Sequence, residues 1–260
     1  MQPRSRMKPT LLIPIYEHKD EIATVVDSLG PTGLPCLIVN DGSGAETRAV
    51  LEQLVAKNPW VTLHHRAQNG GRGAALKTGY RIAFEHGYSH VLQLDADGQH
   101  DTADVPAFVA AMADDPGALV LGAPQFDDSA PKSRLYGRQL SRLMVWLATR
   151  SLAVDDPLCG FRGIPLRPTV ALLDAIPTGD HMEFDPQLII QLCWAGVAVR
   201  NVPTRVVYRS GGLSHFDALW DNVRLSGMYA RALGGMLWRL RLGRGAAASE
   251  SGPGADKDSQ

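Results

Sequence analysis

Hydrophobic residues in the first half of the chain form short continuous runs, and amphipathic segments separate them. Short continuous apolar runs are typical of strands that helices cover on both faces, whereas apolar residues three and four positions apart predict helices with one buried side. The expected strands are residues 10–15, 36–39, 61–64, 91–94 and 119–121. The helices expected between them are residues 22–29, 45–57, 74–86 and 103–113. This alternation predicts an α/β fold with a mostly parallel sheet flanked by helices.

The pattern changes after residue 122. The helices expected there are residues 134–154, 166–175 and 183–194, with a loop over 155–163 and one or two strands over 197–208. Residues 243–260 are rich in Gly, Ala, Ser and charged side chains, which predicts a disordered tail. We therefore expect an N-terminal extension (1–9), one domain (10–215), a C-terminal amphipathic helix (216–242) and that tail (243–260).

Composition narrows the possible functions. The chain has 260 residues, of which 45% are hydrophobic, so it can bury a substantial core. Its formal charge of −1 argues against nucleic acid as a partner. No apolar run approaches the ~20 residues of a spanning helix, so membrane contact would be peripheral. Three cysteines without a CxxC pair indicate a reducing, cytoplasmic compartment and no structural zinc.

A pair of aspartates follows the strand expected at 91–94. Asp95 and Asp97 are two residues apart, so their side chains can share a face, and Gln99 adds an amide oxygen. Ligands of open α/β sheets collect beyond the carboxyl ends of strands. Oxygen-only ligands suit Mg²⁺ or Mn²⁺ shared with substrate phosphates. The alternative is a solvated turn after the strand.

Other strand ends carry polar residues as well. Asp41 could accept hydrogen bonds from a nucleobase, or it could cap the helix that follows. Arg72 lies in a Gly-Arg-Gly turn at a helix start, where backbone N–H groups and a guanidinium could bind a phosphate. That turn has neither P-loop nor dinucleotide-binding spacing, and alone it could be an ordinary helix entry.

Six motifs in order resemble the family 2 glycosyltransferases with the GT-A fold, in particular the dolichol-phosphate-mannose-synthase-like, polyprenyl-phosphate subgroup. They are Pro14-Ile15-Tyr16-Glu17, Val39-Asn40-Asp41-Gly42-Ser43, Asn69-Gly70-Gly71-Arg72-Gly73, Asp95-Ala96-Asp97-Gly98-Gln99-His100, Asp156-Pro157-Leu158-Cys159-Gly160-Phe161-Arg162 and Arg209-Ser210-Gly211-Gly212-Leu213-Ser214-His215. They cover roughly residues 10 to 216. Three positions depart from the family pattern: Glu17 follows Tyr16 directly, Asn40 replaces the first of two aspartates, and His215 replaces a lysine.

The resemblance implies an inverting transfer from a nucleotide sugar with a divalent metal. By position, Asp95, Asp97 and Gln99 would hold Mg²⁺ or Mn²⁺ against the donor diphosphate. The residues implied at the nucleoside are Pro14, Tyr16, Glu17, Asp41 and Arg72. Those implied at the diphosphate or an acceptor phosphate are Arg162, Arg209 and Ser214.

Two assignments have structural alternatives. Arg162 could instead pair with Asp155 or Asp156. Glu183 and Asp185 stand where the family often places a catalytic base, but acids at a helix start are also favoured by the helix dipole. A phosphate acceptor needs no base, whereas a hydroxyl acceptor does.

The C-terminal helix combines apolar residues, two tryptophans and arginines, which is typical of a helix lying on a membrane surface or of a core-packing helix. The expected function is transfer from a UDP- or GDP-sugar to a lipid-linked acceptor, either a polyprenyl phosphate or a lipid or polyene hydroxyl. The expected location is cytoplasmic, at the inner face of the membrane. The alternatives are a sugar nucleotidyltransferase and a non-catalytic nucleotide-sugar-binding protein.

Overall fold

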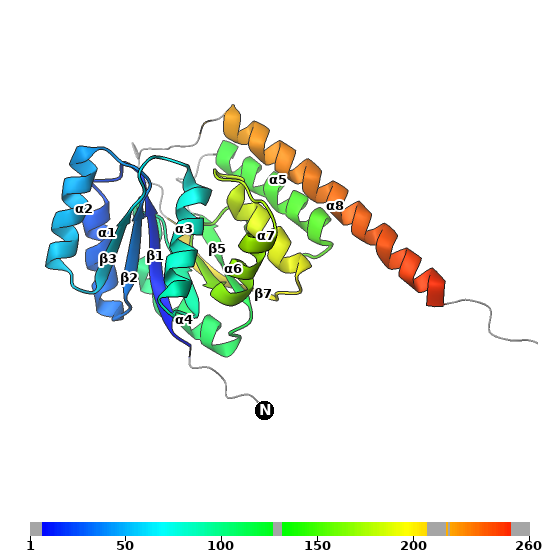
Figure 1. Ribbon diagram of the computed structural model, residues 1–260, viewed down its shortest axis with the longest axis horizontal. Coiled ribbons are helices and arrows are strands. Elements are labelled where there is room, and N and C mark those ends of the chain that lie inside the picture. The colour runs from blue at the N-terminus through cyan, green and yellow to red at the C-terminus, as the bar shows by residue number, and fades with distance from the viewer. Residues whose placement is uncertain (1–6, 127–131, 207–216, 218, 251–260) are drawn as a thin grey trace, which may run out of the picture.

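The computed structural model describes residues 7–126, 132–206, 217 and 219–250 (Figure 1). A seven-stranded sheet forms the centre of this part of the chain, and helices cover both faces. The strands are β1 (Pro9–Ile15), β2 (Cys36–Asn40), β3 (Val61–His65), β4 (His90–Gln93), β5 (Leu119–Phe126), β6 (Arg162–Pro165) and β7 (Val199–Val206). The helices are α1 (Ile22–Leu29), α2 (Ala45–Lys57), α3 (Arg72–Glu85), α4 (Val105–Asp114), α5 (Lys132–Thr149), α6 (Leu166–Ala175), α7 (Phe184–Trp194) and α8 (Trp220–Glu250), with short 3-10 turns η1 (Gly30–Thr32) and η2 (Thr102–Asp104). The predicted fold class is confirmed.

The order of the strands brings several strand ends to one edge of the sheet. The order is β3-β2-β1-β4-β6-β5-β7, and all described neighbours pair in parallel except β6. The carboxyl ends of β1, β2 and β4 therefore lie together. Because β6 is antiparallel to β4 and β5, its first residue, Arg162, pairs with the last residue of β4, Gln93. The start of β6 therefore lies at the same edge of the sheet.

Each face of the sheet has its own hydrophobic core. Neighbouring side chains of a strand point to opposite faces. Leu12 of β1 packs in a core that includes Leu76 of α3 and extends to α5, α6, α7 and α8. Leu11 packs in the other core, which includes Val26 of α1 and Phe108 of α4 and extends to α2. The runs of apolar residues in β1, β2 and β4 follow from this double coverage.

Strand β6 is the main element that the hydrophobic pattern did not predict. The sequence predicted a loop over residues 155–163, and only Ile164 of the four residues in β6 is a strong strand former. Its neighbours β4 and β5 supply the pairing that makes these residues a strand. A short strand with an arginine, a glycine and a proline gives little local signal, because its structure depends on tertiary contacts.

The end of α8 also differs from the prediction. The helix was expected to end at residue 242, and the structure continues it to Glu250. Residues 243–250, for which the sequence predicted disorder, are thus described as the last part of α8. Three consecutive alanines, Ala246 to Ala248, have the highest helix propensity of any residue and favour the longer helix. Residues 251–260 lie outside the described part of the chain.

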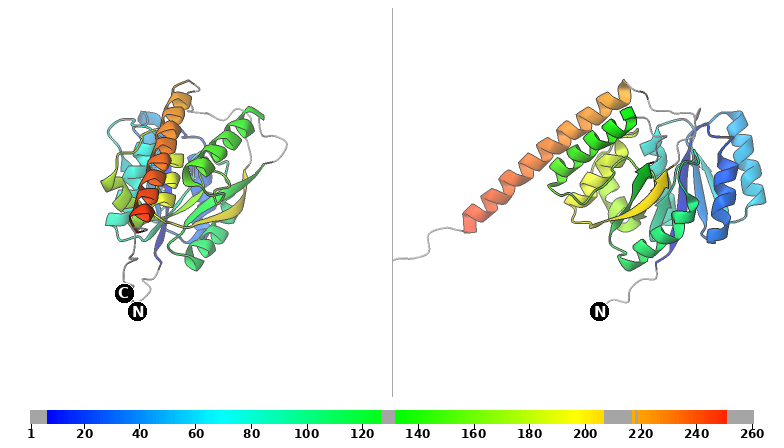
Figure 2. Two further views of the ribbon diagram at one scale, coloured as in Figure 1. Left: turned by 90° about the vertical axis from the view of Figure 1, so that its right-hand side faces the viewer. Right: turned by 180° about the vertical axis from the view of Figure 1, so that it is seen from behind.

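Helices α5 and α8 lie side by side as an outer layer, and the C-terminal half of α8 extends past the body of the domain (Figures 1 and 2). Each helix buries one side: α5 buries Val145 and Ala148, and α8 buries Met228 and Ala232. Their outer sides expose large apolar residues, namely Tyr136, Leu140, Leu143 and Leu147 on α5 and Trp220, Val223, Leu237 and Trp238 on α8. We call these eight residues the outer apolar surface. Within the described residues, every helix is too short or too polar to span a bilayer.

Candidate active site

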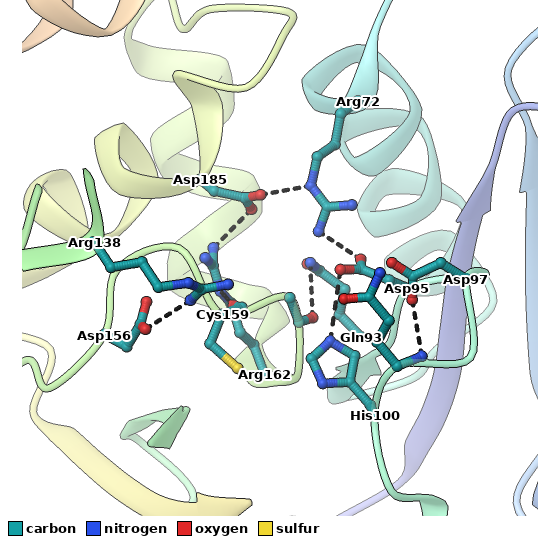
Figure 3. Close-up of polar contacts among 12 residues, drawn as sticks. Arg72, Gln93, Asp95, Asp97, His100, Arg138, Asp156, Cys159, Arg162 and Asp185 are labelled. Atoms are coloured by element: carbon teal, nitrogen blue, oxygen red, sulfur yellow. Dashed lines mark hydrogen bonds and ion pairs between the residues drawn. The ribbon is translucent and has the colours of Figure 1, made fainter. Parts of the chain in front are cut away.

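Four charged side chains from distant parts of the sequence meet at the carboxyl edge of the sheet. Asp95 follows β4, Arg72 begins α3, Arg162 begins β6 and Asp185 lies in the first turn of α7 (Figure 3). All four were predicted site residues. Parallel strands and helix starts share this edge, so the topology brings them together.

These side chains form a continuous line of ion pairs, which we call the acid–arginine chain. Arg72 Nη2 lies 2.7 Å from Asp95 Oδ1, and Arg72 Nε donates to Asp185 Oδ2 at 2.6 Å. Arg162 Nη1 donates to Asp185 Oδ1 at 2.6 Å. Both oxygens of Asp185 are therefore held by guanidinium groups, and Arg72 connects Asp185 to Asp95.

Low exposure to solvent strengthens the ion pairs of the acid–arginine chain. The side chain of Arg162 is 0% exposed and that of Asp185 is 7% exposed. Burial acts to raise the pKa of Asp95, but Arg72 and His100 outweigh it and hold that pKa well below its usual range. Burial acts to lower the pKa of Arg72, but Asp95 and Asp185 outweigh it and raise that pKa. Both groups thus stay charged although they are largely shielded from solvent, with side chains 18% (Arg72) and 23% (Asp95) exposed.

Asp97 lies near Asp95, and Gln99 contacts it through its backbone. Asp97 Oδ1 accepts a hydrogen bond from the Gln99 backbone N–H at 3.1 Å. Burial and the charge of Asp95 raise the pKa of Asp97, and they outweigh the Gln99 backbone N–H, His100 and His18, which act to lower it. The described residues hold no group of three or more His, Cys, Asp or Glu side chains arranged to bind a metal by themselves. Two carboxylates fit a divalent ion only if a substrate supplies further oxygen ligands.

Gln93, the last residue of β4, was not predicted as a site residue. It is fully buried and donates from Nε2 to the carbonyl oxygen of Gly160 at 3.1 Å (Figure 3). Its Oε1 accepts from the Tyr80 hydroxyl at 2.6 Å. One glutamine within an apolar run gives no local signal of this role. The role depends on β6 and the loop before it, which the sequence pattern did not place beside β4.

Asp41 binds a neighbouring loop and does not cap α2. It is 3% exposed, and its carboxylate forms an ion pair with Arg66. It also accepts backbone N–H groups, from Gly70 at 3.1 Å and from Gly71 at 2.8 Å. Asp41 therefore fixes the glycine-rich turn that leads into Arg72, and the helix-cap alternative is wrong.

Glu17 stabilises the start of α2 from the loop after β1. Its backbone has a φ of 57°, which is uncommon for a residue with a side chain. Its carboxylate accepts from the Gly44 N–H at 2.6 Å and from the Thr47 hydroxyl at 2.7 Å. Pro14 is buried within β1, and Tyr16 follows it half-buried at the same edge. These residues border the edge without joining the acid–arginine chain.

The two candidate bases differ in their contacts. Asp185 is enclosed between two arginines, whereas the buried Oε2 of Glu183 has no hydrogen-bond partner among the described residues. The ion pair considered for Arg162 exists with Asp185 and not with Asp155 or Asp156. Asp156 pairs instead with Arg138, at 2.6 Å.

Each nitrogen of the Arg162 guanidinium donates a hydrogen bond within the protein. The group also donates from Nη2 to the Pro157 carbonyl at 2.8 Å and from Nε to the Cys159 carbonyl at 2.5 Å. The remaining predicted residues, Arg209 and Ser214, lie outside the described part of the chain.

Comparison with known proteins identifies the family. The family model described as glycosyl transferase family 2 matches residues 10–162. A polyprenol monophosphomannose synthase of Mycolicibacterium smegmatis is 29% identical over 253 residues, which cover 93% of this chain and 92% of the relative.

Two solved structures share the fold. Glucosyl-3-phosphoglycerate synthase from Mycobacterium tuberculosis, in complex with Mn²⁺, UDP-glucose and phosphoglyceric acid, superposes with a TM-score of 0.65 at 17% identity, covering 89% of this chain and 80% of that one. A mannosyltransferase from Pyrobaculum calidifontis, in complex with GDP-Man and Mn²⁺, gives a TM-score of 0.57 at 16% identity, covering 96% of this chain and 77% of that one.

Proposed function

The chain belongs to glycosyl transferase family 2, and from that premise we propose that it transfers a sugar from a UDP- or GDP-sugar to a polyprenyl phosphate, with inversion. The observation that carries the proposal is the acid–arginine chain, which includes Asp95 and lies next to Asp97. It lies at the edge of the sheet where this fold binds ligands. The family assignment argues against the alternatives of a sugar nucleotidyltransferase and a non-catalytic binding protein.

The donor diphosphate is proposed to bind at Asp95, Asp97 and Gln99 with Mg²⁺ or Mn²⁺. A hard divalent ion held by carboxylates and phosphate oxygens would neutralise charge on the leaving diphosphate. A divalent ion here would offset the burial and the repulsion from Asp95 that raise the pKa of Asp97. Both solved structures described above contain Mn²⁺ with a nucleotide sugar, one with UDP and one with GDP. The nucleoside would lie along the edge formed by Pro14, Tyr16, Glu17 and Asp41, with Arg72 at its phosphate end.

The state of Asp185 favours an anionic acceptor. A general base needs a free oxygen within hydrogen-bond reach of the proton it removes. Both oxygens of Asp185 are bound by Arg72 and Arg162 and are hidden from solvent. A phosphate monoester is already a nucleophile, so its oxygen can attack the anomeric carbon without losing a proton first. The similarity to a polyprenol monophosphomannose synthase supports the same class of acceptor.

Arg162 and Arg209 receive different proposed roles. Because every nitrogen of the Arg162 guanidinium is bonded within the protein, Arg162 is proposed to position Asp185 rather than to contact the diphosphate. Arg209 and Ser214 are proposed to bind the acceptor phosphate, as the family resemblance implies. Glu183, with its unpartnered oxygen, is the base that a hydroxyl acceptor would require.

A lipid acceptor requires contact with a membrane, and the outer apolar surface supports one. Tyr136, Leu140, Leu143 and Leu147 of α5 are 46% to 76% exposed and follow one side of the helix. Helix α5 contains Lys132, Arg134, Arg138 and Arg142 and no acidic residue. Helix α8 adds five arginines against Asp221 and Glu250. We therefore propose that both helices, and not α8 alone, lie against the anionic cytoplasmic face of a membrane.

Two measurements test the proposed reaction. Calorimetry with UDP and with GDP, with and without Mn²⁺, should show metal-enhanced binding of one of them. No enhancement for either nucleotide would contradict the donor site. Transfer assays should then compare a polyprenyl phosphate with the matching polyprenol. We expect transfer to the polyprenyl phosphate, and we expect this activity to persist in the Glu183→Gln variant. Transfer to the polyprenol but not to its phosphate would contradict the proposal of an anionic acceptor.

A further inference from the structure

The segment before β6 lies directly against the carboxylate of Asp95. A Cβ atom added to Gly160 would lie 2.0 Å from Asp95 Oδ2 and 2.6 Å from Oδ1. Atoms in real structures do not approach this closely, so only glycine fits here while Asp95 keeps its position. The backbone of Gly160 therefore forms one wall of the space that holds Asp95, and Arg72 forms another.

The position of Gly160 depends on Gln93. The carbonyl oxygen of Gly160 can only accept, so the Gln93 amide must present its NH₂ group there. Its oxygen then faces Tyr80, whose hydroxyl must donate. Every partner is buried, so these hydrogen bonds have no competing water. The orientation of the Gln93 amide is thus set from both ends.

A second buried donor, Arg162, also binds this segment. Arg162 donates to the carbonyl oxygens of Pro157 and Cys159. These contacts hold two residues that precede Gly160, and the carbonyl of Gly160 is bound by Gln93. Gln93 therefore binds Gly160, which is one of the residues in contact with Asp95, together with Arg72 and His100.

We propose that Gln93 is a positioning residue for Asp95, acting through Gly160, and that it sets the affinity of the site for its divalent ion. The proposal rests on the proposed function of Asp95 as a metal ligand. Groups that orient a metal ligand without touching the ion commonly change metal affinity by about 10–100-fold.

Three variants test the proposal. Gln93→Met keeps the length and burial of the side chain and removes the donor to Gly160. Gly160→Ala leaves Gln93 intact and pushes directly on Asp95. Tyr80→Phe is the matched control, because it removes the other hydrogen bond of Gln93 while the donor to Gly160 remains. Mn²⁺ is titrated calorimetrically into the full-length protein with saturating UDP or GDP, whichever binds the wild type.

Gln93→Met and Gly160→Ala should each weaken Mn²⁺ binding by about 10–100-fold. Tyr80→Phe should stay within about twofold of wild type, although its melting temperature falls because the Gln93 oxygen loses its partner. Donor hydrolysis by Gln93→Met should return toward the wild-type rate at high Mn²⁺, which a general loss of structure would not allow.

Wild-type Mn²⁺ affinity in Gln93→Met would overturn the proposal, whatever the affinity of Gly160→Ala. Equal losses in Gln93→Met and Tyr80→Phe would overturn it as well, because they would indicate a purely structural role. If the wild type itself shows no Mn²⁺-dependent nucleotide binding, the proposed metal site fails instead, so the two failures are distinguishable.

Discussion

The acid–arginine chain and the outer apolar surface both depart from the usual separation of charge outside and apolar groups inside, and they do so in opposite ways. In the acid–arginine chain, Arg162 and Asp185 are buried and Arg72 and Asp95 are partly buried, but each of these charged groups pairs with another member. On the outer apolar surface, Tyr136 and Trp238 are 76% and 63% exposed. The charges of the acid–arginine chain are compensated by one another. No described residues cover the outer apolar surface, so this surface indicates a partner outside the molecule.

The largest expected effect comes from breaking the acid–arginine chain. Arg162→Met leaves Asp185 buried with one guanidinium instead of two, and removing one member of a buried ion pair typically costs about 3–5 kcal/mol of unfolding free energy. The double variant Arg162→Met/Asp185→Leu should recover part of this loss, because no unpaired charge remains between the two positions. Urea denaturation measures both. A loss below about 1 kcal/mol in the single variant would mean that the pairing is not what compensates the burial.

The second prediction separates stability from activity within the same region. Asp97→Asn should lower glycosyl transfer by about 100-fold or more, because a metal ligand is lost. Its unfolding free energy at neutral pH should stay equal or rise. Burial and Asp95 raise the pKa of Asp97 in the folded protein, so its ionised form is disfavoured there and a neutral amide relieves the repulsion.

The control for this variant is Asp114→Asn, which removes an exposed carboxylate at the end of α4. It should change neither activity nor stability. If Asp97→Asn destabilises the fold while activity survives, Asp97 is a structural residue and not a metal ligand.

These two regions also show how far the sequence could predict the molecule. The strands β1, β2 and β4 and the polar residues after them could be predicted, because apolar runs and turn residues are local signals. The contact between Arg72 and Asp185 joins positions 113 residues apart, so it depends on the packing of α3 against α7. Asp95 could be predicted as a site residue, but its restraint by Gly160 could not, since β6 carries no local signal of its own.

A third, smaller effect concerns the outer apolar surface. Leu140→Asp/Leu143→Asp should reduce binding to vesicles containing anionic lipid by about 10-fold or more, because two exposed leucines no longer enter the bilayer. Since both side chains face solvent, the unfolding free energy should change by less than about 1 kcal/mol. Co-sedimentation with anionic and with zwitterionic vesicles measures the binding.

Gln139→Asp is the matched control, because it adds negative charge at an exposed polar position of the same helix. It should reduce binding less than the leucine variant does. If wild type binds neither vesicle type but sizing shows a stable dimer that the leucine variant dissociates, the partner of this surface is a second copy of the chain.

The smallest expected effect tests whether burial, rather than pairing alone, distinguishes the acid–arginine chain. Lys19 and Glu46 form an ion pair near the same edge of the sheet, but the Glu46 side chain is 81% exposed. Its contact with Lys19 lowers the pKa of Glu46, yet water screens both charges. Glu46→Gln should therefore leave the urea midpoint unchanged within error, in contrast to Arg162→Met. If Glu46→Gln and Arg162→Met lower the urea midpoint by similar amounts, ion pairing stabilises this edge of the sheet whether or not the charges are buried. The acid–arginine chain would then differ from the outer apolar surface only in that the surface exposes apolar residues.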